Sequence, residues 1–174
     1  EIYQMLKQLL EKWYLHFGEA EPEIIVRAPG RVNIIGEHTD YNEGFVMPGA
    51  MSKAVYMLMS RLPPGPLPLN PLKGRGNYWV SFDFNEEIEF EVTLPLNAPL
   101  WSKYVQGAID IFLAENLRLS PSHPLTLSSS HRLLIGGDLP IGAGVSSSSS
   151  LVCGVLYCLQ QLYHADFSKE ELAI

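Results

Sequence analysis

Residues 132–162 read RLLIGGDLPIGAGVSSSSSLVCGVLYCLQQL, and this stretch decides the fold. Residues 132–135, with three apolar residues after Arg132, predict a strand. Apolar residues at steps of three and four from Leu151 to Leu162 predict a long helix with one buried side. A loop rich in glycine and serine joins the two. The remaining elements are predicted around this strand, loop and helix.

The loop at residues 141–150, IGAGVSSSSS, has the composition of an anion-binding site. Backbone N–H groups at the start of a helix have no intrahelical acceptor, and glycines let the backbone approach a phosphate closely. The helix start adds roughly half a positive charge, and serine hydroxyls can cap the helix or coordinate Mg²⁺. The loop therefore suits the phosphates of ATP, although it lacks the lysine of a Walker A loop. A serine-rich loop that only caps a helix is the alternative.

Residues 27–44, RAPGRVNIIGEHTDYNEG, concentrate polar side chains in a chain of which only 18% is charged. The side chains of Glu37, His38 and Asp40 can bind the hydroxyl groups of a sugar. Arg31 follows a turn-prone proline and glycine, and a guanidinium can stabilise negative charge on a transferring phosphoryl group. A solvated turn or a metal site would have a similar composition.

The rest of the chain predicts a mixture of helices and strands. Apolar residues at helical steps indicate an N-terminal helix from Ile2 to Phe17, ended by Gly18. The other predicted elements are strands at 23–28, 54–60, 78–84 and 88–92, with a turn at 85–87, and a helix at 101–117. The proline-rich segment 61–77 predicts a surface loop. No internal repeat or linker divides the chain, so we expect one domain.

Composition argues against several classes of partner. The formal net charge of -7 offers no basic surface for nucleic acid. No apolar run approaches the roughly 20 residues that span a bilayer, so we expect no membrane partner and a cytoplasmic location. Cys153 and Cys158 are five residues apart in one predicted helix. That spacing excludes a disulfide or a zinc site, and we expect both to be reduced core residues.

Two segments together resemble a known family. Residues 29–42, PGRVNIIGEHTDYN, resemble the galactokinase signature, and residues 139–148, LPIGAGVSSS, resemble the phosphate loop of GHMP kinases. Residues 101–107, WSKYVQG, are similar to the segment that follows the early hairpin in galactokinases. The three segments occur in the family's order and span most of this chain.

This resemblance implies transfer of the γ-phosphate of ATP to the 1-hydroxyl of α-D-galactose, which gives galactose 1-phosphate at the entry to the Leloir pathway. It implies that Arg31 stabilises the transition state. The implied galactose-binding residues are Glu37, His38, Thr39 and Asp40. The implied ATP-binding residues are Ser81, Trp101, Gly142, Ala143, Gly144, Val145, Ser146, Ser147 and Ser148. Of these, Ser148 is also the implied Mg²⁺ ligand.

The implied fold is α+β, namely the N-terminal domain of GHMP kinases. This domain has a mixed sheet with helices on one side, similar to ribosomal protein S5. Residues 1–174 are expected to form its galactose- and ATP-binding domain. The C-terminal domain, the catalytic Asp and a Mg²⁺-binding Glu of the family are expected beyond Ile174. We therefore expect little or no kinase turnover from these 174 residues alone.

The serine run departs from the family pattern, because Ser149 and then Ser150 stand where an alanine is usual. This change leaves the backbone donors of the loop in place, so nucleotide binding is expected to survive. Two other functions remain open at this point. One is a catalytically silent galactose and ATP sensor, and the other is an N-acetylgalactosamine kinase. The sequence carries no indication of the oligomeric state.

Overall fold

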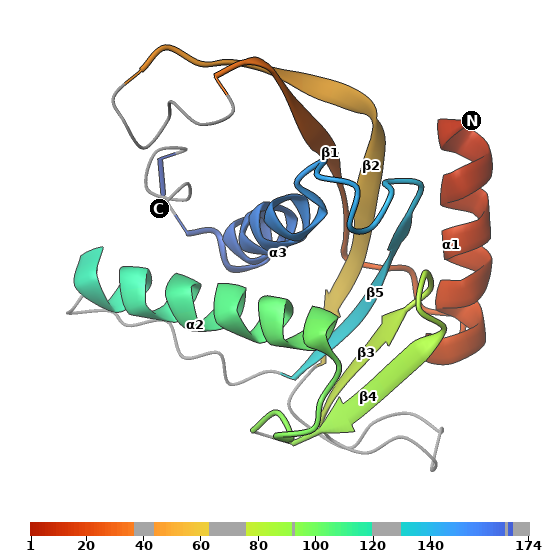
Figure 1. Cartoon of the computed structure of the whole chain (residues 1–174). Coiled ribbons are helices and arrows are strands. Elements are labelled where there is room, and N and C mark those ends of the chain that lie inside the picture. The colour runs from red at the N-terminus through yellow and green to blue at the C-terminus, as the bar shows by residue number, and fades with distance from the viewer. Residues whose placement is uncertain (37–43, 63–75, 92, 120–129, 166, 169–174) are drawn as a thin grey trace.

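The computed structural model describes residues 1–36, 44–62, 76–91, 93–119, 130–165 and 167–168. The elements run in the order α1 (Ile2–Phe17), β1 (Ile24–Ile35), β2 (Met47–Arg61), β3 (Asn77–Ser81), β4 (Glu86–Phe90), α2 (Leu100–Leu119), β5 (His131–Gly137) and α3 (Ser147–Tyr163). Figure 1 shows one sheet with helices packed against it. None of the helices in these described ranges is long and apolar enough to cross a membrane.

The five strands form one mixed sheet in the order β1-β2-β5-β3-β4. Strand β3 pairs with β5 in parallel, and the other neighbours pair antiparallel. The parallel pair follows from the connection between them, because the chain leaves the β3–β4 hairpin, passes through α2 and returns alongside β3. The α+β class with a mixed sheet, predicted from the sequence, is confirmed.

Helices α2 and α3 cover one face of the sheet and form the larger core with it. The helices contribute Val105 and Phe112 from α2 and Val155 and Leu159 from α3, all at most 1% exposed. Trp79 of β3 is completely buried in the same cluster, and its ring meets that of Phe90 edge-on at 4.7 Å between centroids. This core fixes the start of α3 relative to the sheet.

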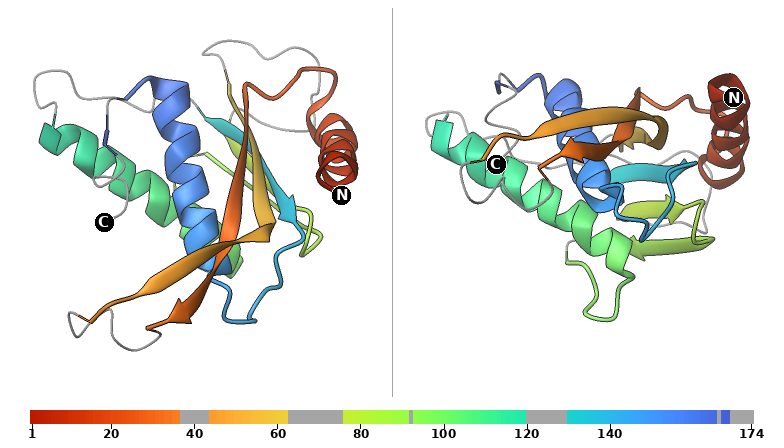
Figure 2. Two further views of the ribbon diagram at one scale, coloured as in Figure 1. Left: turned by 90° about the horizontal axis from the view of Figure 1, so that it is seen from above. Right: turned by 45° about the horizontal axis from the view of Figure 1, so that its top comes forward.

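Helix α1 covers the opposite face of the sheet, so the prediction of helices on one side holds for α2 and α3 only (Figure 2). Leu9, Trp13 and Phe17 of α1 pack against Tyr56 and Leu58 of β2. Side chains alternate between the two faces of a strand, and Met57 and Met59 of β2 lie in the other core. Both faces of β2 carry apolar side chains, so helices pack against both faces. The predicted end of α1 at Gly18 is confirmed, with a backbone φ of 81° there.

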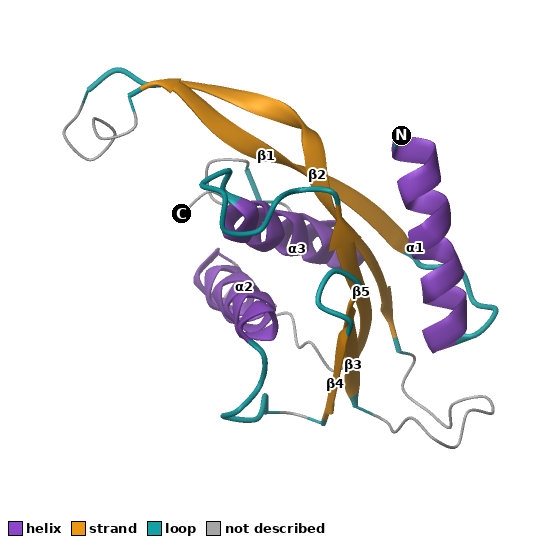
Figure 3. Ribbon diagram, turned by 45° about the vertical axis from the view of Figure 1, so that its right-hand side comes forward, coloured by secondary structure: helices purple, strands orange, loops and turns teal. Residues whose placement is uncertain are grey.

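Strands β1 and β2 are longer than their predicted ranges, because both extend past the sheet as a two-stranded ribbon (Figure 3). Arg31 pairs with Ala50 and Ile35 with Met47 in this ribbon, while β2 begins to pair with β5 only at Val55. Ile35 in the ribbon is 64% exposed, so the extension shows no pattern of buried residues. A search for buried apolar alternation cannot find such a segment.

The segment around Arg31 is therefore a strand and not the predicted turn. Pro29 and Gly30 lie inside β1, where the pairing register shifts between Pro29 and Arg31. A proline is tolerated there because β1 is one of the two edge strands of the sheet. The predicted turn at 85–87 lies earlier, at residues 82–85, and Asn85 ends it with a φ of 50°.

The two cysteines differ in environment. Cys158 is completely buried in the core, and burial raises the pKa of its thiol to about 12. Cys153 is exposed on α3, so the prediction that both are core residues is wrong for Cys153. Cys153 lies beside residues 25–28 of the edge strand β1 and is not enclosed by it, which a count of apolar residues along the helix does not distinguish. Both cysteines are free, as predicted.

His131 at the start of β5 predicts a pH dependence of stability. Burial lowers the pKa of its imidazole to about 4 from 6.5, and its Nε2 lies 2.8 Å from the hydroxyl of Tyr163. Below pH 6.5 the unfolded chain binds a proton at this position and the folded chain does not, so stability falls with pH until about pH 4. Wild type should lose about 2 kcal/mol more than His131→Gln between pH 7 and pH 4.5. Urea unfolding followed by circular dichroism measures this difference, and parallel losses in the two proteins would contradict it.

Candidate functional site

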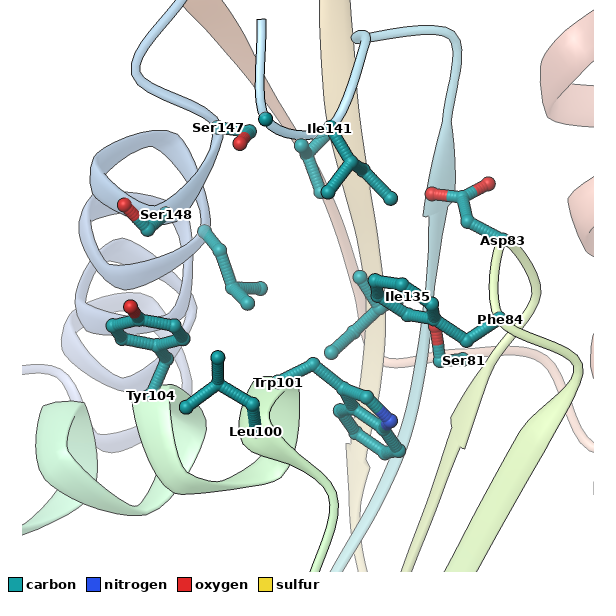
Figure 4. Close-up of a pocket in the computed structure, with 13 residues that line it drawn as sticks. Ser81, Asp83, Phe84, Leu100, Trp101, Tyr104, Ile135, Ile141, Ser147 and Ser148 are labelled. Carbon is teal, nitrogen blue, oxygen red and sulfur yellow. The ribbon is translucent and has the colours of Figure 1, made fainter. Parts of the chain in front are cut away.

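A pocket opens between the start of α3, the start of α2 and the β3–β4 turn (Figure 4). Its volume is about 300 Å³, at the small end of the roughly 300–1,000 Å³ typical of small-molecule sites. Apolar side chains form most of its wall, and polar groups lie at the α3 end and near the turn. Its lining residues are Val55, Ser81, Asp83, Phe84, Leu100, Trp101, Tyr104, Ile135, Ile141, Gly142, Ser147, Ser148 and Leu151.

The loop that enters α3 presents a free helix start at one end of this pocket. Gly142 and Gly144 have φ angles of 74° and 71°, and Ser146 has a φ of 60°. A side chain at either glycine would meet open space, so the glycines are required by the backbone conformation and not by crowding. Within the described part of the chain, the side chain of Ser146 does not cap α3. The first N–H groups of α3 therefore remain available to an anion.

The same loop is fastened to strand β1. The backbone N–H of Arg31 donates a 3.1 Å hydrogen bond to the carbonyl of Val145. The hydroxyl of Ser150 donates to the carbonyl of Pro29 at 2.8 Å. A Cβ on Gly30 would lie 3.0 Å from the Val145 carbonyl oxygen and would collide with a methyl of Leu139, so the two segments are in close contact. Arg31 is exposed and lies directly beside the loop.

Trp101 and Ser81 form the part of the wall farthest from the loop. Trp101 stands in the first turn of α2 and is 5% exposed, and its indole N–H donates a 2.7 Å hydrogen bond to a carboxylate oxygen of Glu86. Ser81 ends β3 and is 2% exposed. Tyr104 lies one helical turn after Trp101 and is 40% exposed at the pocket. The wall therefore offers aromatic and apolar surface suited to a flat ring.

Asp83 is the acidic residue that lines this pocket. Partial loss of water around its carboxyl raises its pKa. The N–H of Gly137 donates a 3.1 Å hydrogen bond to it and opposes that rise, while the negative charge of Asp138 adds to it. The carboxyl of Asp138 itself accepts from the N–H of Ala54 at 2.9 Å and contacts Lys53. Burial raises the pKa of Asp138, but these contacts outweigh burial and lower it overall.

The predicted site residues differ in where they lie. Five line the pocket together, namely Ser81, Trp101, Gly142, Ser147 and Ser148. Ala143, Gly144, Val145 and Ser146 complete the loop between Gly142 and α3 without lining the pocket. Arg31 does not line it either and adjoins the loop through its backbone. Glu37, His38, Thr39 and Asp40 lie outside the described residues.

Sequence reasoning missed several residues of the pocket. Tyr104 could have been found, because its spacing of three from Trp101 puts both on one side of a helix. Asp83 and Phe84 were assigned to a strand that in fact ends at Ser81, so their position in a turn was not predicted. In the described ranges, no three His, Cys, Asp or Glu side chains are grouped to hold a metal ion. A metal here would depend on the hydroxyl of Ser148 and on oxygens of a bound ligand.

Comparison with known proteins shows which families the chain is similar to. Residues 11–61 match the family described as the galactokinase galactose-binding signature, and residues 103–174 match the GHMP kinases N terminal domain. A galactokinase of Roseiflexus sp. (strain RS-1) is 37% identical over 168 residues, which is 96% of this chain and 38% of that protein. The chain therefore spans well under half the length of this relative.

Solved structures of kinases are also similar to this chain. The crystal structure of Lactococcus lactis galactokinase complexed with galactose matches 96% of this chain and 39% of its own, with a TM-score of 0.73 and 29% identity. The Methanococcus jannaschii mevalonate kinase structure matches 88% of this chain and 44% of its own, with a TM-score of 0.66 and 17% identity. The second likeness concerns the fold alone.

Proposed function

The chain belongs to the galactokinase family of GHMP kinases, and on that premise we propose that it forms the galactose- and ATP-binding domain of a sugar kinase. The proposed reaction transfers the γ-phosphate of ATP to the 1-hydroxyl of galactose. One observation supports the nucleotide half most strongly. An apolar, partly aromatic pocket ends at a helix start that has no side-chain cap within the described chain, with glycines of positive φ beside it.

In this proposal the adenine ring lies in the pocket against Trp101, with Ser81 and Tyr104 beside it. The triphosphate lies along residues 142–148, where backbone N–H groups donate to its oxygens. The fit rests on two properties of the chain. The pocket is apolar where a base would bind, and the donors are concentrated at the end where the phosphates would bind.

Arg31 is proposed to stabilise the negative charge of the phosphoryl group during transfer. Its support is the hydrogen bond from its backbone to Val145, which ties this position to the phosphate loop at 3.1 Å. A guanidinium that is held in place in advance stabilises developing charge without reorganisation. Glu37, His38, Thr39 and Asp40 are proposed to bind galactose, and they follow Arg31 by six to nine positions. This part of the proposal rests on the sequence signature.

Mg²⁺ is proposed to accompany the nucleotide, with Ser148 as the contribution of this chain. A single hydroxyl is a weak ligand, and Mg²⁺ bound to a nucleotide is held largely by phosphate oxygens and water. When bound, the ion neutralises charge on the β- and γ-phosphates. The residues of this chain bind and orient the substrates around it.

Isothermal titration calorimetry tests the proposal directly. The chain should bind MgATP, and it should bind galactose in preference to glucose and N-acetylgalactosamine. Alanine at Asp40 should remove galactose binding and leave ATP binding within about twofold, because the two ligands are proposed to use separate residues. A chain that binds neither ATP nor galactose would refute the proposal. A preference for N-acetylgalactosamine would reassign the substrate.

A further inference from the structure

We propose that Glu86, the first residue of β4, is a positioning residue for the nucleotide: it holds the indole of Trp101 in the orientation that a base can stack on. The inference rests on the proposed function, since it concerns the same pocket. Glu86 does not line that pocket. It therefore acts through Trp101 and not on the ligand itself.

The contact is a single directed hydrogen bond. An indole has one polar atom, the Nε1–H donor, so its partner decides which way the ring is turned. Here the partner is a carboxylate oxygen of Glu86 at 2.7 Å, a length typical of a charge-assisted bond. Trp101 is 5% exposed, so little water competes for this donor. The bond therefore selects one ring orientation.

The position of Glu86 connects three parts of the pocket. Glu86 pairs across the hairpin with Ser81, which lines the pocket, and its side chain reaches Trp101 on α2. Strand β4 is the edge strand at this end of the sheet, and Trp101 belongs to a different element, the first turn of α2. Backbone pairing alone does not fix the ring of Trp101 relative to Ser81. The Glu86 carboxylate supplies that link.

The simplest alternative is that Glu86 only strengthens the contact between α2 and the hairpin. Two ligands separate these roles. ATP uses both the pocket and the loop, whereas inorganic tripolyphosphate uses the loop alone. If Glu86 orients Trp101, its substitution weakens the binding of ATP and leaves the binding of tripolyphosphate unchanged. If Glu86 only stabilises the fold, its substitution changes the affinity for both ligands by the same factor or changes neither affinity.

The experiment measures both dissociation constants by calorimetry in the presence of Mg²⁺. Glu86→Ala should weaken ATP binding about tenfold, as the loss of one charge-assisted hydrogen bond predicts. It should leave the affinity for tripolyphosphate within about twofold of wild type. Glu86→Gln should bind ATP nearly as wild type, because an amide oxygen also accepts from the indole. Glu89→Ala removes an equal charge from the same strand and should have no effect. In a Trp101→Phe background, Glu86→Ala should cause no further loss of ATP affinity.

Three results would overturn the inference. The first is ATP binding by Glu86→Ala that is as tight as in wild type. The second is an equal loss of affinity for both ligands. The third is an equal loss of ATP affinity with and without the indole of Trp101. Glu86 is exposed, so the substitution is expected to leave the fold intact, and thermal unfolding verifies this. Failure of the proposed function looks different, because the wild-type chain itself would then bind no ATP, and the inference would fall with it.

Discussion

Gly144→Val should weaken the binding of MgATP to this chain about a hundredfold. Gly144 has a φ of 71°, a conformation that a β-branched residue adopts only under strain. Valine forces the loop into another conformation, which turns backbone donors away from the phosphates. Losing one or two charge-assisted hydrogen bonds, each worth about 1.5–3 kcal/mol, accounts for an effect of this size.

Gly144→Asn is the matched control for this substitution. Asparagine tolerates positive φ better than other residues with a side chain, and a side chain at position 144 would meet open space. The asparagine variant should therefore keep most of the ATP affinity, within about fivefold of wild type. Calorimetry on both variants makes the comparison, with circular dichroism to verify folding. If valine and asparagine bind ATP equally, the backbone conformation of the loop is not what binds the phosphates.

The second large effect concerns stability. Trp79→Ala should lower the free energy of unfolding by about 3–5 kcal/mol, because it removes a completely buried tryptophan side chain from the core between the sheet and α2. Trp79 is 0% exposed and packs edge-on against Phe90. For a domain of this size the loss corresponds to a fall in Tm of roughly 10 °C. Chemical and thermal unfolding measure it, and a loss below about 1 kcal/mol would contradict the packing described here.

Trp79→Phe separates packing from polarity at the same position. The indole N–H of Trp79 is buried and meets no acceptor among the residues that the structure describes. Phenylalanine removes this unsatisfied donor, which offsets part of the volume lost. Trp79→Phe should therefore lower the free energy of unfolding by less than half as much as Trp79→Ala does. Equal losses in the two variants would show that the N–H has a partner that stabilises the fold.

The strand, loop and helix at residues 132–162 could be predicted because each has a local cause. Apolar periodicity marks α3, and the glycines and serines mark its start. The side of the sheet that α1 covers could not be read from the stripe of α1, since a stripe shows burial and not the partner. The position of α1 is explained by β2, in which residues 54–60 are all buried. A strand that is apolar at every position is covered on both faces.

The candidate site divides in the same way. The sequence grouped Gly142, Ser147 and Ser148 by their order in the chain, and all three line one pocket. The hydrogen bond from Trp101 to Glu86 could not be predicted, because it joins two elements whose approach depends on the whole sheet. Arg31 was expected on a turn, since proline and glycine favour turns, but edge strands also tolerate them. Local composition did not distinguish these two settings.

In the proposed binding mode, one site binds a nucleotide with its phosphates on the loop before α3 and its base against Trp101. A titration of the ¹⁵N-labelled chain with MgATP, followed by two-dimensional NMR, tests it most directly. Binding in this mode should give saturable shifts of the backbone amides of residues 142–148, together with a shift of the indole N–H of Trp101. Shifts confined to other regions, or amide shifts with no response of that indole, would contradict it.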